Sequence, residues 1–231
     1  MKKERMIGFI MMLILLSSIA FGKDFYVSSS TGSEQSDGTK EKPFLKIGAA
    51  IEASQGTADD PSDIKVAMGV YSENIRMKDY VNLLGGYEPE KWERDKQFNS
   101  TIIEGRNFDS VITFAETKGG SVSGFWIING KSTIGGGIFC LNSSPTISSN
   151  LISANYAEQG GGILCSGSSA EILNNVISGN QALRGGGILC FESSPIIQNN
   201  IVSGNFSEDA GILLIKSPAE IYRNIVSGNV S

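Results

Sequence analysis

The sequence predicts an all-β protein, a parallel solenoid built from coils of 24–25 residues. A Gly-Gly-Gly-Ile-x-Cys motif recurs at residues 135–140, 160–165 and 185–190, and a degraded copy follows at 210–214. A fixed repeat of roughly 20–50 residues is typical of solenoids, because each repeat is one structural unit that stacks on the next. The length of 231 residues suits one elongated domain.

Residues 1–22 are predicted to be a secretory signal peptide. A charged start precedes the apolar run Met6–Leu16, which is too short to span a bilayer comfortably. Ala20 and Gly22 form a small-residue cleavage site, so cleavage is expected before Lys23. A retained N-terminal anchor is the alternative. We therefore expect a secreted, periplasmic or cell-surface protein that spans no membrane once the signal peptide is removed.

Residues 23–60 are predicted to form a strand, a polar loop and a capping helix. The strand covers Asp24–Val27 and the loop covers Ser28–Lys42. Pro43 is expected to open an amphipathic helix that ends near Gly56. Its apolar face consists of Phe44, Ile47, Ala50 and Ile51. We expect this face to cover the open end of the solenoid core, as terminal repeats must.

The remaining chain divides into irregular first coils, residues 61–129, and regular repeats, residues 130–231. The irregular part includes a charged insertion, Glu88–Ser100, which carries Trp92. Each regular coil has room for three short strands and repeats apolar pairs and two asparagines, at Asn150, Asn175, Asn200, Asn224 and at Asn155, Asn180, Asn205, Asn229. Stacked asparagine amides hydrogen-bond from coil to coil, and asparagine tolerates the left-handed backbone of a tight bend. The pattern stops at Ser231 without a polar cap, so we expect a fragment, a truncated gene or a stack continued in another chain.

The composition makes two function classes poor candidates. The chain has 19 Lys and Arg against 24 Asp and Glu, a net charge of −5. An acidic protein is a poor ligand for nucleic acid, whose phosphates require a basic face. The chain contains no histidine, so it has no imidazole for general-base catalysis or metal ligation.

Three cysteines, Cys140, Cys165 and Cys190, recur at a spacing of 25 residues. Equivalent positions of successive coils stack, so we expect a ladder of buried thiols, since cysteine behaves as a small apolar residue. One disulfide between neighbours is the alternative. A metal or catalytic role is disfavoured, because there is no Cys-x-x-Cys motif, and no metal site is predicted.

Several segments carry a resemblance to a known superfamily. They are Tyr26-Val27-Ser28, Gly38-Thr39 with Pro43-Phe44, the run Val66–Ile75, and Leu84-Gly85-Gly86-Tyr87. With these segments the chain resembles right-handed parallel β-helix proteins of the pectin-lyase-like superfamily, and in particular secreted bacterial members. The resemblance implies a right-handed coil for nearly all of the mature chain. It implies little about activity, because the superfamily includes lyases, hydrolases, esterases, epimerases and adhesins.

A column of apolar residues is the candidate binding surface. If Ile163 and Cys165 point inward, the residue between them points outward, as do its equivalents in other coils. The column consists of Phe139, Leu164, Leu189 and Leu213. Solvent disfavours such a stripe, so a loop or partner covers it, the strand turns it inward, or it docks a sugar or protein.

No catalytic residue is identified from the sequence. Glu192 and Lys216, and Arg184 with Glu208 or Asp209, are expected to form surface ion pairs, while Glu171 and Glu220 lie two coils apart. The favoured hypothesis is an exported module for extracellular or cell-surface binding or display, with a carbohydrate or adhesin-type interaction. The alternative, implied by the resemblance, is a polysaccharide lyase for acidic polysaccharide, with a Lys or Arg base and Ca²⁺; no other cofactor is expected.

Overall fold

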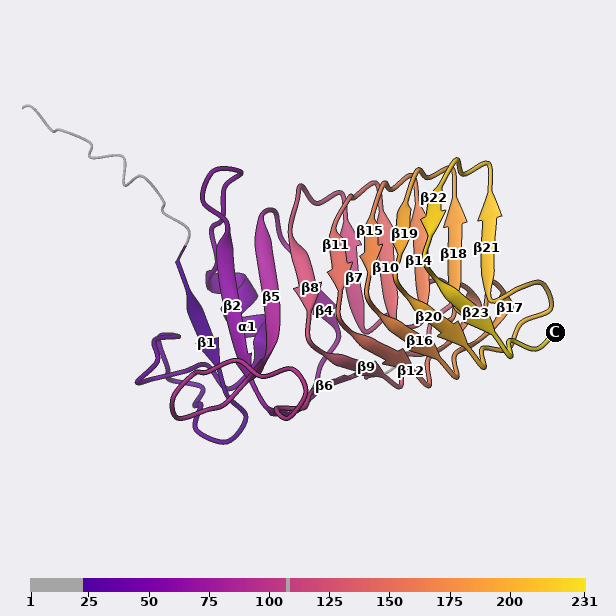
Figure 1. Cartoon of the computed structure of the whole chain (residues 1–231). Helices are drawn as coiled ribbons and strands as arrows, with labels where there is room; N and C mark the ends of the chain where they lie inside the picture. The colour runs from indigo at the N-terminus through magenta and orange to yellow at the C-terminus, as the bar shows by residue number, and fades with distance from the viewer. Residues whose placement is uncertain (1–22, 107–108) are drawn as a thin grey trace, which may run out of the picture.

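The computed structural model describes residues 23–106 and 109–231, so the predicted signal peptide, residues 1–22, lies outside the described residues. The chain winds into a stack of short parallel strands (Figure 1), which confirms the predicted all-β solenoid. Each regular coil contributes one strand to each of three sheets, because its apolar segments are only three or four residues long and glycine or asparagine turns separate them. No helix among the described residues has both the length and the apolar character needed to cross a bilayer.

The three sheets run the length of the stack. Sheet A contains β1 (Phe25–Val27), β2 (Ser62–Ala67), β5 (Val81–Tyr87), β8 (Ser121–Ser123), β11 (Thr146–Ser148), β15 (Glu171–Leu173), β19 (Ile196–Gln198) and β22 (Glu220–Tyr222). Sheet B contains β3 (Gly69–Ser72), β6 (Thr101–Glu104), β9 (Trp126–Ile128), β12 (Leu151–Ser153), β16 (Val176–Ser178), β20 (Ile201–Ser203) and β23 (Ile225–Ser227). Sheet C contains β4 (Ile75–Arg76), β7 (Ile112–Ala115), β10 (Ile138–Leu141), β14 (Ile163–Ser166), β18 (Ile188–Phe191) and β21 (Ile212–Ile215). The looser turn between sheets B and C adds a small pair, β13 (Tyr156–Gln159) and β17 (Gln181–Arg184).

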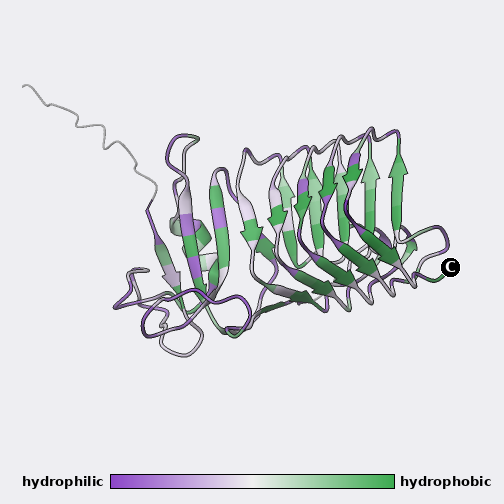
Figure 2. Ribbon diagram, viewed as in Figure 1, coloured by the Kyte–Doolittle hydropathy of each residue, from purple (hydrophilic) through white to green (hydrophobic). Residues whose placement is uncertain are grey.

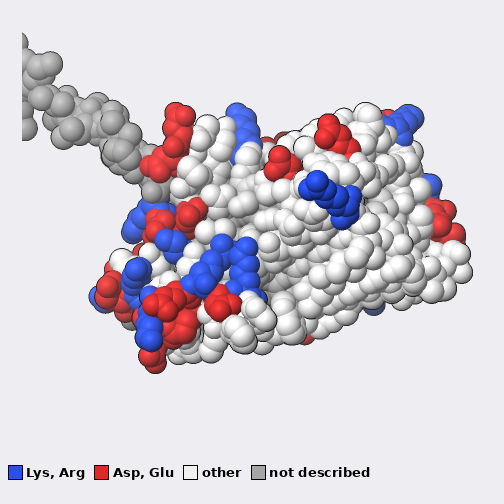
Figure 3. All heavy atoms as spheres, viewed as in Figure 1, with Lys and Arg blue, Asp and Glu red and all other residues white. Residues whose placement is uncertain are grey.

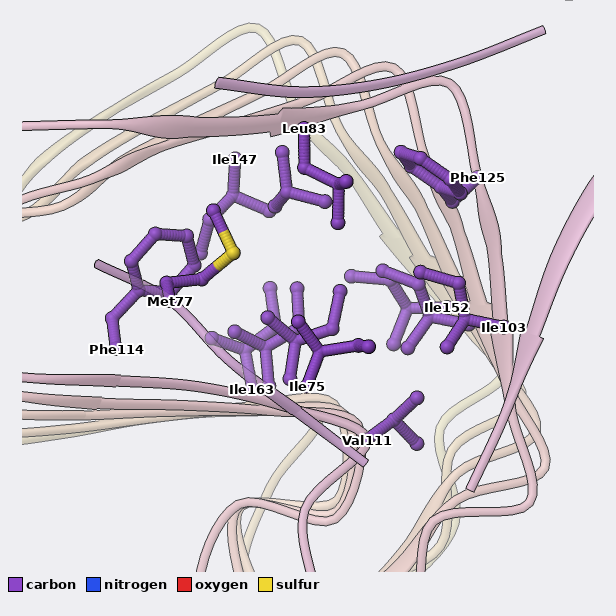
Figure 4. Close-up of a cluster of buried hydrophobic side chains, with 14 of the residues drawn as sticks. Ile75, Met77, Leu83, Ile103, Val111, Phe114, Phe125, Ile147, Ile152 and Ile163 are labelled. Carbon is purple, nitrogen blue, oxygen red and sulfur yellow. The ribbon is translucent and has the colours of Figure 1, made fainter. Parts of the chain in front are cut away.

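The core fills the space between the three sheets. Figure 4 shows isoleucines from all three walls pointing at one another, with Ile147 from sheet A, Ile152 from sheet B and Ile163 from sheet C. Burying an aliphatic side chain of this size stabilises the fold by about 1.5–3 kcal/mol. Because every coil repeats the same inward positions, the core is a set of apolar columns parallel to the stacking axis.

The predicted thiol ladder is confirmed. Cys140 pairs in register with Cys165, and Cys165 with Cys190. All three are fully buried and free, so neighbouring thiols are not joined as a disulfide. Hydrogen bonds between neighbouring thiols, together with burial, raise the pKa of Cys165 and Cys190.

Two asparagine ladders join the coils at the turns that flank sheet B. Asn175 Nδ2 donates to the carbonyl of Ile147 at 2.9 Å and to Asn200 Oδ1 at 3.1 Å, and its neighbours repeat the pattern. The predicted left-handed backbone lies one residue earlier than expected: Asn174 and Asn199 have φ of 56°, whereas the ladder asparagines are not left-handed. The preceding residue makes the bend, which leaves the ladder amide facing inward.

The single described helix, α1 (Ile47–Ala53), begins four residues later than predicted. Phe44 pairs with Val27 as an extended residue, so Pro43 does not open the helix. The helix starts at Ile47 because the carboxylate of Glu73 accepts the backbone N–H groups of Ile47 and Gly48, at 2.8 and 3.0 Å. Its apolar face, Ile47, Ala50 and Ile51, is buried against β1, β2 and β4.

Candidate functional site

The predicted outer stripe lies in register on sheet C. Phe139, Leu164, Leu189 and Leu213 are consecutive partners across β10, β14, β18 and β21. They lie outside the main core cluster, which holds their neighbours in the alternating pattern, so the strand alternation was predicted correctly. However, Leu164 is only 4% exposed and Leu189 only 1%. The centre of this stripe is therefore inaccessible to a ligand, while Phe139 and Leu213 are half-buried.

The glycine turns cover the stripe. A Cβ added to Gly160 would lie 2.8 Å from the Cβ of Leu164, and one added to Gly185 would lie 2.9 Å from that of Leu189. Both glycines also have a left-handed backbone, with φ of 66° and 62°. A residue with a side chain would be strained at these positions, both by the left-handed backbone and by the close contact of its Cβ with the leucine. The first glycine of each triplet thus lets the turn fold against its own strand.

A different apolar row is exposed, on sheet B. Its members are Trp126, Leu151, Val176, Ile201 and Ile225, which pair in register from β9 to β23 and are called the apolar row below. Trp126 is 43% exposed, Val176 37%, Ile201 40% and Ile225 59%. These side chains point away from the core because the middle residue of each strand, such as Ile177, points inward.

The face around the apolar row carries little charge. The strands β9, β12, β16, β20 and β23 contain no charged residue. Figure 3 shows this face as a broad uncharged surface, and Figure 2 shows that its strands are mostly hydrophobic. The second outward position is serine in four of the five strands, at Ser153, Ser178, Ser203 and Ser227. The face therefore combines an apolar row with a parallel row of hydroxyl groups.

A groove of about 270 Å³ lies at the N-terminal end of the apolar row. One side comes from the insertion, through Lys96 and Ser100, and the other from turns that include Ser149 and Asn174. The first three members of the apolar row, Trp126, Leu151 and Val176, also line it. The groove thus places an exposed indole beside one ammonium group and several neutral polar groups.

Aromatic contacts hold the insertion in place. Trp92 is 8% exposed and packs edge-on against Tyr26, with ring centroids 4.8 Å apart. Arg94 donates from Nε to the carbonyl of Gly85 at 2.8 Å and from Nη2 to that of Ser123 at 2.9 Å. Lys96 Nζ bonds to Ser123 Oγ at 3.1 Å. Lys96 lines the groove, and its partial burial, followed by the nearby Arg94, lowers the pKa of its ammonium group.

The predicted ion pairs are present on the surface. Arg184 Nε lies 2.9 Å from Asp209 Oδ2, and Lys216 Nζ lies 3.1 Å from Glu192 Oε1. Surface pairs of this kind contribute about 0–1 kcal/mol. Glu171 and Glu220 lie two coils apart in one column, as predicted, with Ile196 between them. Among the described residues no three acidic or cysteine side chains gather as potential metal ligands.

The sequence pattern missed the apolar row. It showed the pairs Leu151-Ile152 and Val176-Ile177, but not which member of each pair points inward. In a strand of three residues the alternation is too short to decide, and only the register with the neighbouring coils settles it.

Comparison with protein families gives a match over most of the chain. The model of the family described as protein of unknown function (DUF1565) matches residues 30–230, nearly the whole described chain. No curated protein and no solved structure matches the chain. The family match extends from the polar loop before α1 to the last coil, so it includes the groove and the apolar row. The chain therefore belongs to the DUF1565 family of proteins of unknown function.

Proposed function

We propose that the protein is an exported binding module that attaches to carbohydrate outside the cell or at its surface. In this proposal it is a right-handed β-helix of the pectin-lyase-like type, with α1 covering the N-terminal end of its core. The predicted signal peptide supports export. The observation that carries the binding function is the exposed apolar row, which ends in Trp126 at the groove.

The chemistry of the groove suits a sugar. Sugar rings have an apolar face and a hydroxyl-bearing edge, and binding sites for such ligands combine an aromatic surface with a few placed polar groups. Trp126 offers the aromatic surface, and Lys96, Ser149 and Asn174 offer donors or acceptors at its edges. An uncovered apolar row of this length is a feature of binding surfaces rather than of inert ones.

Tryptophan fluorescence tests the binding function. The chain has two tryptophans, Trp126 at 43% exposure and Trp92 at 8%, so a ligand in the groove acts mainly on Trp126. A panel of neutral and acidic glycans is expected to include one that shifts the emission and reduces acrylamide quenching. Trp126→Ala should abolish that response. A panel in which no glycan binds by fluorescence or calorimetry would refute carbohydrate binding.

Two further measurements test the rest of the proposal. Fractionation of cells that express the full chain should recover it outside the cytoplasm, with Lys23 as its first residue. Assays on uronate polymers, with and without EDTA, test the lyase alternative. Calcium-dependent release of an unsaturated product would show that the protein is an enzyme and would refute the proposal of a binding module.

A further inference from the structure

We infer that the groove and the apolar row together bind a neutral polysaccharide that lies along the solenoid axis. This inference rests on the proposed carbohydrate function and names its ligand class, an uncharged polymer of linked hexose rings. A polymer in this position runs across the strands, with its first ring on Trp126 and later rings on Val176 and Ile201.

The geometry favours a polymer over a single sugar. The apolar row has one residue per coil in unbroken register, so it extends parallel to the stacking axis. Four steps of about 4.8 Å between neighbouring strands give the apolar row a length of about 19 Å, whereas each three-residue strand is only about 10 Å long. The groove opens directly onto it, because Leu151 and Val176 belong to both. One sugar would fill the groove and leave the rest of the apolar row uncovered.

The charge distribution favours a neutral polymer over an acidic one. The five strands beneath the apolar row contain no charged residue, and Lys96 is the one charged side chain that lines the groove. An acidic chain would bring several carboxylates against apolar side chains, where Lys96 at one end of the row and Arg223, two residues before Ile225, at the other are too few cations to pair with them, and such desolvation is unfavourable.

The serine row favours a ligand rich in hydroxyl groups. Within the described residues, the hydroxyls of Ser153, Ser178 and Ser203 make no hydrogen bond, and all three are half-exposed. Other serines of the same coils do bond: Ser168 Oγ and Ser193 Oγ each join neighbouring backbone groups. The free hydroxyls lie two residues from the apolar row, about 6.6 Å along each strand. A sugar edge gives them partners, whereas a second apolar surface would leave them without any.

Affinity electrophoresis with three matched variants tests this inference. The full chain runs through gels that contain hydroxyethyl cellulose, a neutral β-glucan, polygalacturonate or alginate, and pull-downs use insoluble cellulose and chitin. Val176→Glu and Ile201→Glu place a charge on the apolar row, and Phe191→Glu places one on sheet C. The three parent side chains are 37%, 40% and 38% exposed, so the substitutions are matched in burial.

The inference predicts retardation by a neutral polymer and a loss of about tenfold or more for the two sheet B variants, since each buries a charge under the ligand. Phe191→Glu should bind within about twofold of the parent, and affinity should change little with salt, because no exposed ion pair contributes. Urea unfolding of all three variants checks that they remain folded.

Other outcomes overturn the inference in distinguishable ways. Binding to the acidic polymers alone, with strong salt dependence and loss in Lys96→Gln, would make the ligand anionic while leaving carbohydrate binding intact. If the Val176→Glu and Ile201→Glu variants still bind a neutral polymer as the parent does, the binding site lies elsewhere on the protein. If the parent binds no glycan and is a dimer, and the sheet B variants are monomers, both proposals are refuted. The apolar row would then be an interface between two copies of the chain.

Discussion

Removal of one ladder asparagine should show how strongly the turns hold the coils together. In Asn175→Ala, the backbone N–H of Asn150 loses its acceptor at 3.0 Å, and the carbonyl of Ile147 loses one donor, the Asn175 amide at 2.9 Å. Asn150 is 3% exposed and Ile147 fully buried, so water does not easily replace the lost partners. A buried group left without a partner costs about 1–3 kcal/mol and the loss of one further hydrogen bond about 0.5–1.5 kcal/mol, which gives about 1.5–4.5 kcal/mol in all.

Two neighbouring hydrogen bonds of the ladder remain in Asn175→Ala and limit the loss of stability. Asn150 Nδ2 keeps its bond to the carbonyl of Val122, and Asn200 Oδ1 still accepts the backbone N–H of residue 175. The expected decrease in the free energy of unfolding, about 1.5–4.5 kcal/mol, is a large part of the roughly 5–15 kcal/mol that stabilises a typical domain. Urea denaturation followed by circular dichroism measures it, with the slope compared between variants to check two-state behaviour.

A neighbouring asparagine provides the control. Asn199 is exposed and left-handed, and glycine adopts that backbone without strain, so Asn199→Gly should stay within about 1 kcal/mol of the parent. Asn175→Asp keeps the acceptor but loses the donor, and should also destabilise strongly. A decrease below about 1 kcal/mol for Asn175→Ala, or equal effects of Asn175→Ala and Asn199→Gly, would refute the ladder as a source of stability.

Three further predictions concern the core, a buried phenol and the insertion. Cys165→Asp is expected to lower the free energy of unfolding by several kcal/mol, because the carboxylate would lie in a fully buried column; the control is Ser166→Asp on the outward side, and equal melting temperatures would contradict the inward column. Burial raises the pKa of Tyr71 to about 12 from 10.0, so the folded state holds the proton more tightly than the unfolded state. Stability should therefore fall as the pH rises from about 10 to about 12, by at most about 2.7 kcal/mol, and alkaline urea titrations of Tyr71→Phe should lack this loss; parallel profiles would disprove the assignment. Trp92→Ala should lower the free energy of unfolding by about 3–5 kcal/mol and admit trypsin at Lys91 or Lys96, whereas continued resistance to trypsin would show that other contacts hold the insertion.

The repeats made most of the scaffold predictable. The spacing of 25 residues between Cys140, Cys165 and Cys190 fixed the coil length, and alternation placed these thiols inside, as the structure has them. Regular stacking converts a sequence period directly into spatial register, so the ladders followed from the period alone. The start of α1 did not, because it depends on Glu73, a partner 26 residues further along the chain.

The candidate site was harder to predict, because exposure depends on what covers a strand as well as on which way its side chains point. Leu164 was correctly assigned to the outer side of its strand, but the turn at Gly160 packs against it. Trp126 lies in an irregular coil outside the motif, and its partner in the groove, Lys96, comes from an insertion. Only the folded chain brings the two together.

Hydroxyl-radical footprinting with a neutral polysaccharide tests the central claim most directly. Oxidation of each side chain is measured by mass spectrometry with and without the polymer. The account predicts reduced oxidation of Trp126, Val176 and Ile201, with Phe191 on sheet C unchanged at a comparable exposure of 38%. Protection of Phe191 with no change along the apolar row would contradict the assignment of sheet B as the binding face.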